Sequence, residues 1–250
     1  MRYGVLRAHP LPAPDNGLPM RLTTLLLILL VTSPCHGDEV LRIAVAANFR
    51  ATLEHINPEF ERDNNIRLSL SSASTGVLAT QIRHGAPFDV FFSADSQTPA
   101  TLRSVTSMLP PECYAVGKLA LVGGNGNLDQ LALPELSVAI ANPVTAPYGR
   151  AAQAVLSRDE FASGSTRKLV RGNNVVQAYQ FWHTGGTNLA LLAQSIAPRE
   201  ATPVPSDWHA PLEQHLLILK KSKRLDRYLN WLRSDRVRSV ITSAGYDPCP

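Results

Sequence analysis

The chain has 250 residues, of which 44% are hydrophobic and 18% are charged, and its formal net charge at pH 7 is +4. This length allows one large domain or two lobes with separate cores, and the composition excludes disorder over long stretches. Three basic residues and one acidic residue fall within residues 1–37, so the remaining chain carries only +2. This weak charge, without a stripe of Lys and Arg, argues against nucleic acid as the main partner.

The N-terminus, residues 1–37, has the pattern of a secretory signal peptide. An arginine after Met20 precedes the largely apolar run LTTLLLILLV, and small residues lead to Gly37. This pattern predicts export to the periplasm. If translation starts at Met20, residues 1–19 are an upstream extension. The run is too short to span a bilayer. A lipoprotein signal at Cys35 is the alternative, although Pro34 fits that signal badly.

Two cysteines, Cys113 and Cys249, lie beyond residues 1–37. Because an exported protein meets an oxidising compartment, we expect a disulfide between them, with two free thiols as the alternative. No spacing of Cys and His is typical of a metal site, and we expect no cofactor.

The remaining chain opens with a strand and a helix. LRIAVAA, residues 41–47, is a continuous apolar run, which is typical of a strand covered on both faces. Apolar residues at spacings of four, three and four then predict a helix from Phe49 to Phe60, with Asn48 as its N-cap. Residues 66–71 alternate between apolar and polar and predict the next strand.

Six small residues, SSASTG at 71–76, feed the next predicted helix, which we expect to end at Gly85. A Ser/Thr/Gly turn at a helix N-terminus can bind an anion, because free N–H groups and the helix dipole converge there. An ordinary capping turn has the same sequence pattern. The following strand, residues 88–92, completes a β-α-β-α-β unit, which predicts a parallel sheet with ligands at the carboxyl ends of its strands.

The second half repeats this pattern. We expect a helix over residues 96–112, a crossing into a second lobe after Tyr114, and a strand that returns to the first lobe before C-terminal helices. The other predicted strands are 118–124, 136–142, 168–172 and, last in the second lobe, 189–193, with the returning strand at 212–221. Two further strand-to-helix turns, at Pro147–Gly149 and Asn173–Val175, again offer backbone N–H groups. The expected fold is α/β with two lobes, residues 38–116 plus 210–250 and residues 117–209, which close on a ligand.

Several segments together resemble the periplasmic molybdate-binding proteins of ABC importers. The segments are AVAANF (44–49), SASTGVLATQI (72–82), GAPFDVFFSAD (85–95), NPVTAPYGRAA (142–152), GNNVVQA (172–178) and AGY (244–246). The resemblance covers residues 40–246 and implies a type II periplasmic-binding fold with the ligand cleft between two lobes. It also implies molybdate and tungstate as ligands, the membrane subunits of an ABC importer as partner, and a monomer.

The resemblance also implies a set of oxyanion ligands. They are Ala47, Asn48, Ser74, Thr75, Tyr148 and Val175. Val175 contributes its backbone N–H, and molybdenum is bound only as molybdate. Some members have a tyrosine where this chain has Ala193, and the resemblance implies that Tyr148 supplies that phenol instead.

A site of this kind makes chemical sense for a doubly charged oxyanion. Backbone N–H groups, hydroxyls and an Asn amide donate without a Lys or Arg, and helix N-termini compensate the charge. Donors that cannot accept disfavour a protonated ion such as hydrogen phosphate, and the size of the cage separates molybdate from sulfate.

The alternatives are a binding protein for another oxyanion such as sulfate, a regulatory ligand sensor and an enzyme on the same fold. The chain has no Gly-x-Ser-x-Gly elbow and no nucleophile with an evident base, and Asp95 and His84 are isolated. We therefore expect a binding protein and not an enzyme.

Overall fold

The computed structural model describes residues 40–106 and 109–250 of the chain. The described residues all belong to one compact unit, residues 38–250. The expected signal peptide and its alternatives at Met20 and Cys35 lie outside the described residues. Within the described part of the chain, no helix combines the length and apolarity that crossing a membrane requires.

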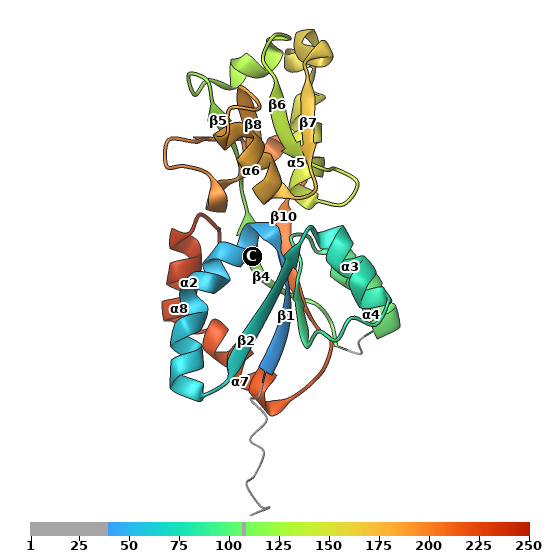
Figure 1. Cartoon of the computed structure of the whole chain (residues 1–250), viewed down its shortest axis with the longest axis vertical. Coiled ribbons are helices and arrows are strands. Elements are labelled where there is room, and N and C mark those ends of the chain that lie inside the picture. Colours follow the sequence, from blue (N-terminus) through green and yellow to red (C-terminus); the bar gives the residue numbers. More distant parts are fainter. Residues whose placement is uncertain (1–39, 107–108) are drawn as a thin grey trace, which may run out of the picture. The chain divides into compact units, whose positions relative to one another are not determined.

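The first of two sheets has five strands in the order β2-β1-β3-β10-β4. The strands are β1 (Val40–Ala46), β2 (Arg67–Ala73), β3 (Val90–Phe92), β4 (Glu112–Gly117) and β10 (Leu212–Ile218). β1 pairs in parallel with β2 and β3, whereas β10 is antiparallel to β3 and β4. Its helices are α2 (Ala47–Asn64), α3 (Thr75–Arg83), α4 (Gln97–Thr106), α7 (Lys223–Leu232) and α8 (Asp235–Ser243). Figure 1 shows α2 and α8 on one side of this sheet and α3 and α4 on the other.

The second sheet has the order β7-β6-β8-β5-β9. Its strands are β5 (Leu119–Gly123), β6 (Val138–Ala141), β7 (Leu169–Gly172), β8 (Leu189–Ala193) and β9 (Thr202–Pro203). Two α-helices, α5 (Pro147–Leu156) and α6 (Val175–His183), follow β6 and β7. Short 3₁₀ segments are η1 (Leu128–Ala132), η2 (Asp159–Thr166), η3 (Gln194–Ile196) and η4 (Ser206–Trp208).

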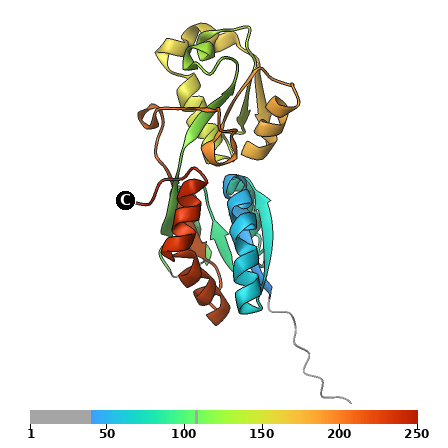
Figure 2. The same cartoon turned by 90° about the vertical axis from the view of Figure 1, so that its left-hand side faces the viewer.

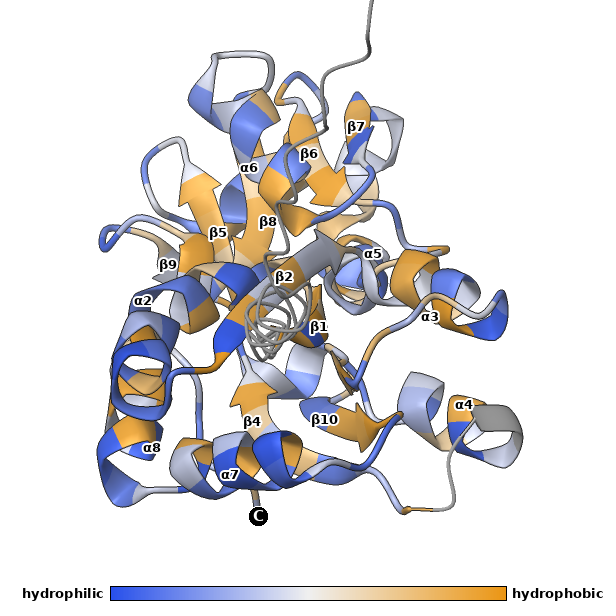
Figure 3. Cartoon of the chain, turned by 60° about the horizontal axis from the view of Figure 1, so that its bottom comes forward, coloured by the Kyte–Doolittle hydropathy of each residue, from blue (hydrophilic) through white to orange (hydrophobic). Residues whose placement is uncertain are grey.

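Each sheet has its own hydrophobic core. The first sheet packs against α2, α7 and α8 on one face and against α3 and α4 on the other. The second sheet packs against α5 and α6. Figure 3 colours β5, β6 and β8 almost wholly as hydrophobic, as expected of strands covered on both faces. Two sheets with separate cores confirm the predicted α/β class.

The chain passes between the sheets twice, once between β4 and β5 and once between β9 and β10. Figure 2 shows the first passage as a green ribbon. The carboxyl ends of β1 and β7 lie at the junction of the two sheets, where the helices that follow them, α2 and α6, contact one another. The start of α3 meets the loop after β6 there, through the hydrogen bond from Gly76 N–H to Thr145 O.

Two sequence-based expectations about elements are wrong, the extent of one helix and the last strand of the second sheet. The predicted helix over 96–112 ends at Thr106, ahead of Pro110 and Pro111, because a residue that precedes proline avoids the helical conformation. The passage expected after Tyr114 follows the edge strand β4, which pairs with β10 and leads directly to β5 of the second sheet. The strand at 189–193 is not the last of its sheet, since the two-residue β9 pairs with β5.

Candidate functional site

Four helix starts surround one small cavity of about 10 Å³. α2 begins at Ala47 and α3 at Thr75, both after strands of the first sheet, while α5 begins at Pro147 and α6 at Val175, after strands of the second. The residues that line the cavity are Ala46, Ala47, Asn48, Ser74, Thr75, Ala94, Ala146, Pro147, Tyr148, Asn174 and Val175. The structure therefore places all six residues of the expected ligand set at this one cavity.

The first turns of these helices supply backbone donors, because the initial N–H groups of any helix have no carbonyl within the helix to bind. At α2, α3 and α5 the N-cap residue makes no side-chain hydrogen bond to these groups. At α6 the cap is Asn174, whose Oδ1 accepts a hydrogen bond from the N–H of Gln177 at 3.0 Å. This bond leaves the N–H of Val175, at the first position of the helix, at the cavity.

Two hydroxyl groups stand at the start of α3. The Ser74 side chain is only 4% exposed, and its Oγ has no hydrogen-bond partner in the described structure. Thr75 Oγ1 accepts a hydrogen bond from the N–H of Ala94 at 3.0 Å, which leaves the Thr75 hydroxyl proton to be donated elsewhere. Because a buried unpaired hydroxyl costs about 1–3 kcal/mol, the Ser74 position indicates a ligand that accepts from it.

Asn48 has a different role from the one expected. It lies inside the first turn of α2, whose N-cap is Ala46, so Asn48 is not the cap. Its Nδ2 donates to Gln214 Oε1 at 2.9 Å and to Tyr246 Oη at 3.2 Å. The side-chain amide is thus occupied within the protein, and the group that Asn48 offers the cavity is its first-turn backbone N–H.

Tyr148 lines the cavity at the start of α5, and its hydroxyl oxygen accepts a hydrogen bond from outside the cavity wall, which leaves the hydroxyl proton to be donated elsewhere. The Tyr148 Oη accepts a hydrogen bond from Gln214 Nε2 at 3.0 Å, and Gln214 does not line the cavity. Burial raises the pKa of Tyr148 well above its ordinary value, so the phenol stays neutral. The structure places Tyr148 in the cavity wall, where it is expected to replace the tyrosine that is missing at Ala193. Its hydroxyl oxygen contacts Gln214.

Sequence reasoning missed Gln214, which is fully buried and contacts two of the expected ligands. A signal was present in β10, where Leu212, Gln214 and Leu216 alternate with more exposed residues. A Gln side chain at an inward-facing position of a strand requires buried hydrogen-bond partners. The alternation in β10 could therefore have indicated a buried polar contact of Gln214.

The cavity wall contains no charged side chain. The nearest cation in the sequence to the start of α5 is Arg150, whose Nη2 lies 2.6 Å from Asp95 Oδ2 and is neutralised by it. Among the described residues no group of three or more His, Cys, Asp or Glu side chains could hold a metal ion. The positive potential of this wall therefore comes from helix N-termini.

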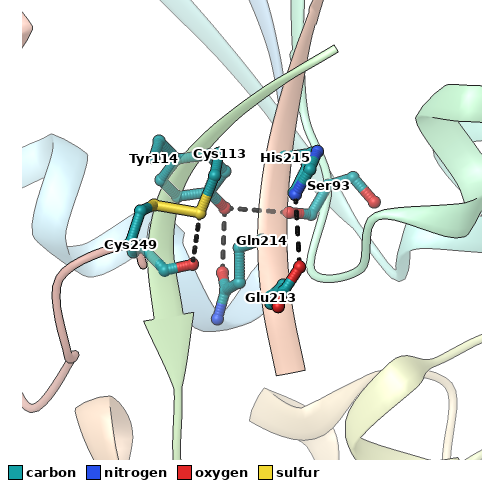
Figure 4. Close-up of a disulfide and its surroundings, with 8 residues drawn as sticks. Ser93, Cys113, Tyr114, Glu213, Gln214, His215 and Cys249 are labelled. Carbon is teal, nitrogen blue, oxygen red and sulfur yellow. Dashed lines mark hydrogen bonds and ion pairs between the residues drawn. A yellow bond between two sulfur atoms is a disulfide. The ribbon is translucent and has the colours of Figure 1, made fainter. Parts of the chain in front are cut away.

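A disulfide joins Cys113 of β4 to Cys249, with an S–S distance of 2.02 Å. It closes beside the network around Gln214. Figure 4 shows the neighbouring Tyr114 hydroxyl between Gln214 Oε1, at 2.8 Å, and the carbonyl oxygen of Ser93, at 3.0 Å.

Comparisons with known proteins agree with this fold. Residues 41–247 match the family model described as bacterial extracellular solute-binding protein. The molybdate-binding protein ModA of Azotobacter vinelandii is 34% identical over 223 residues, which cover 82% of this chain and 88% of that protein. ModA of Rhodobacter capsulatus is 32% identical over 240 residues, covering 90% and 94%.

The solved structure of the Azotobacter vinelandii periplasmic molybdate-binding protein superposes with a TM-score of 0.75 at 28% identity, covering 84% of this chain and 100% of that one. The expected resemblance and the two-lobed periplasmic-binding fold are confirmed. These relatives are named as binding proteins, in agreement with the expectation that the chain is not an enzyme.

Proposed function

Because the chain belongs to the family of bacterial extracellular solute-binding proteins, we propose that it binds molybdate, and also tungstate, in the periplasm for an ABC importer. Two relatives that are more than 30% identical to it are named molybdate-binding proteins, which supports this choice of ligand. The Azotobacter vinelandii relative of known structure is a periplasmic protein, which supports the same compartment for this one.

The observation that carries the proposal is the meeting of four helix starts at an uncharged cavity wall. Each helix N-terminus is equivalent to about half a positive charge, so four of them match a doubly charged ion. The ligand set that we propose is the backbone at Ala47, Asn48 and Val175, the Ser74 and Thr75 hydroxyls, and Tyr148 at the start of α5.

The same wall favours some oxyanions over others. The lining residues include no carboxylate that could accept a hydrogen bond from the protonated oxygen of hydrogen phosphate, so this ion is disfavoured. Sulfate is smaller than molybdate, and a cage closed around the larger ion leaves the oxygens of the smaller ion with longer hydrogen bonds.

We further propose that the ion reaches the site by separation of two lobes, residues 38–116 plus 210–250 and residues 117–209. The cavity of about 10 Å³ has room for about one water molecule, which is less than a tetrahedral oxyanion needs. Opening admits the ion, and closure around it brings the four helix starts to its oxygens.

The substitution Thr75→Ala tests the site. It removes one hydroxyl donor to a charged ligand, so molybdate binding should weaken by about 1–3 kcal/mol, measured by calorimetric titration. The matched control Thr75→Ser keeps the hydroxyl and should retain affinity close to that of the unmodified protein. An unchanged Kd in Thr75→Ala would contradict the proposed site.

A further inference from the structure

A cluster of buried polar side chains connects the two sheets beside the cavity. From the first sheet and its helices it includes Asn48, Tyr114, Gln214 and Tyr246, and from the second it includes Tyr148 and Ser195. We call these six residues the bridging cluster. Binding of the ion as proposed above does not require Gln214, Tyr246 or Ser195, and none of these three lines the cavity.

The first bridge runs through Gln214 of β10. Its Oε1 accepts from Asn48 Nδ2 at 2.9 Å and from the Tyr114 hydroxyl at 2.8 Å, and its Nε2 donates to Tyr148 Oη at 3.0 Å. The Tyr148 hydroxyl lies against Gly117, where β4 leaves the first sheet. A Cβ atom at Gly117 would be only 2.0 Å from Tyr148 Oη, so this contact requires glycine.

The second bridge runs through Ser195 of η3. Ser195 Oγ donates to the backbone oxygen of Asn48 at 3.2 Å and accepts from the Tyr246 hydroxyl at 2.9 Å. The Tyr246 oxygen in turn accepts from Asn48 Nδ2 at 3.2 Å. Both bridges therefore end on Asn48, a residue that also lines the cavity.

We propose that Gln214 and Ser195 are positioning residues that hold the two lobes closed through Asn48, whether or not an ion is bound. The identity of that ion rests on the proposed function, but the bridges consist of protein atoms alone. When the lobes separate, water can bind the polar groups of the bridging cluster, whereas in the closed form these buried groups depend on one another. The Tyr246 hydroxyl has a second acceptor, Asn48 O at 2.8 Å, so loss of Ser195 removes the link between the lobes and leaves Tyr246 bonded within the first lobe. Removal of one partner therefore penalises the closed form more than the open form.

Double electron–electron resonance between spin labels on the two lobes tests the proposal. Gln81 of α3 and Gln180 of α6 are exposed and can be replaced by labelled cysteines in residues 38–250, where the two native cysteines form the disulfide. Two labelled proteins are compared, one otherwise unmodified and one with Tyr148→Phe plus Ser195→Ala. Each is measured without ion and with saturating molybdate. Matched controls are Tyr179→Phe and Ser163→Ala, whose hydroxyls form hydrogen bonds with His183 and Ala132, both within the second lobe.

We expect a short-distance population in the unmodified protein and in the controls without ion, and its loss in the double variant. Each removed hydroxyl should also raise the Kd for molybdate about 3- to 10-fold. Ser195→Thr alone keeps the hydroxyl and should leave both the distances and the Kd close to those of the unmodified protein. Equal distance distributions in the double variant and the controls would overturn the proposal. If the unmodified protein bound no oxyanion, the proposed function would fail, and the ion-free distances would still decide on the bridges.

Discussion

At the scale of single residues, the neighbouring hydroxyls of Ser74 and Thr75 differ in whether they form a hydrogen bond within the protein. Thr75 Oγ1 supports the protein itself, because it accepts the N–H of Ala94. Ser74 Oγ is buried and makes no such bond in the described structure. A hydroxyl that folding leaves unpaired is a cost to the empty protein, and a ligand that accepts from it removes that cost.

Ser74→Ala should therefore separate stability from binding. Without ion, its free energy of unfolding in urea should equal or exceed that of the unmodified protein, because no hydrogen bond is lost. Molybdate binding should weaken by about 1–3 kcal/mol. Thr75→Ala, by comparison, should lose both stability and affinity. A Ser74→Ala protein that is destabilised but binds normally would show that Ser74 serves only the fold.

Tyr246 links stability to pH. Burial raises the pKa of its phenol from the ordinary value of 10.0 to about 12, partly opposed by its hydrogen bonds with Ser195 and Asn48. Since the folded pKa is raised, the stability from the neutral phenol is complete below pH 10 and is lost as pH rises towards 12. Between pH 9 and pH 11 this group should cost the protein about 1.4 kcal/mol of unfolding free energy.

Urea unfolding at pH 9 and pH 11, compared between the unmodified protein and Tyr246→Phe, measures this contribution. The other buried tyrosines titrate in both proteins, so their effects cancel in the comparison. Over this interval the variant should lose about 1.4 kcal/mol less stability than the unmodified protein. An equal loss in both proteins would mean that Tyr246 does not titrate with a raised pKa.

At the scale of elements, the helix starts could be predicted because strand-to-helix turns carry local signals. Small residues before α3, the Pro-Tyr-Gly start of α5 and the Asn pair before α6 each indicate where a helix begins, and the structure starts these helices at Thr75, Pro147 and Val175. The turn at Asn48 carried the same signal, yet the helix starts at Ala47, two residues before the predicted start at Phe49. Gln214 and Tyr246 bind the Asn48 amide, and both are distant in sequence.

Features that depend on partners distant in sequence carry no local signal, and sequence reasoning missed them. β9 has only two residues and one is Pro203, so it exists because β5 offers an edge to pair with. The contacts of Gln214 with Asn48 and Tyr148 join residues 166 and 66 positions apart. Such contacts are products of the tertiary fold, and a pattern of neighbouring residues does not contain them.

At the scale of the whole described unit, the two sheets share the cavity, and each contributes two helix starts to it. Polar contacts that join the two sheets include the ion pair Arg150–Asp95 and the hydrogen bond from Gly76 N–H to Thr145 O at 2.8 Å. Most of each core belongs to one sheet, and only a few small or edge residues of the first sheet, such as Ala46, Ala94 and Leu212, pack into the core of the second. This organisation fits a protein that opens and closes around a small ion.

Calorimetric titration of residues 38–250 with molybdate, tungstate, sulfate and phosphate in parallel tests the central claim most directly. We expect tight one-to-one binding of molybdate and tungstate and no measurable binding of sulfate or phosphate, because the cavity wall has no carboxylate to accept from a protonated ion and the proposed cage fits the larger ions. A preference for sulfate or phosphate, or the absence of binding to all four ions, would contradict the proposed function.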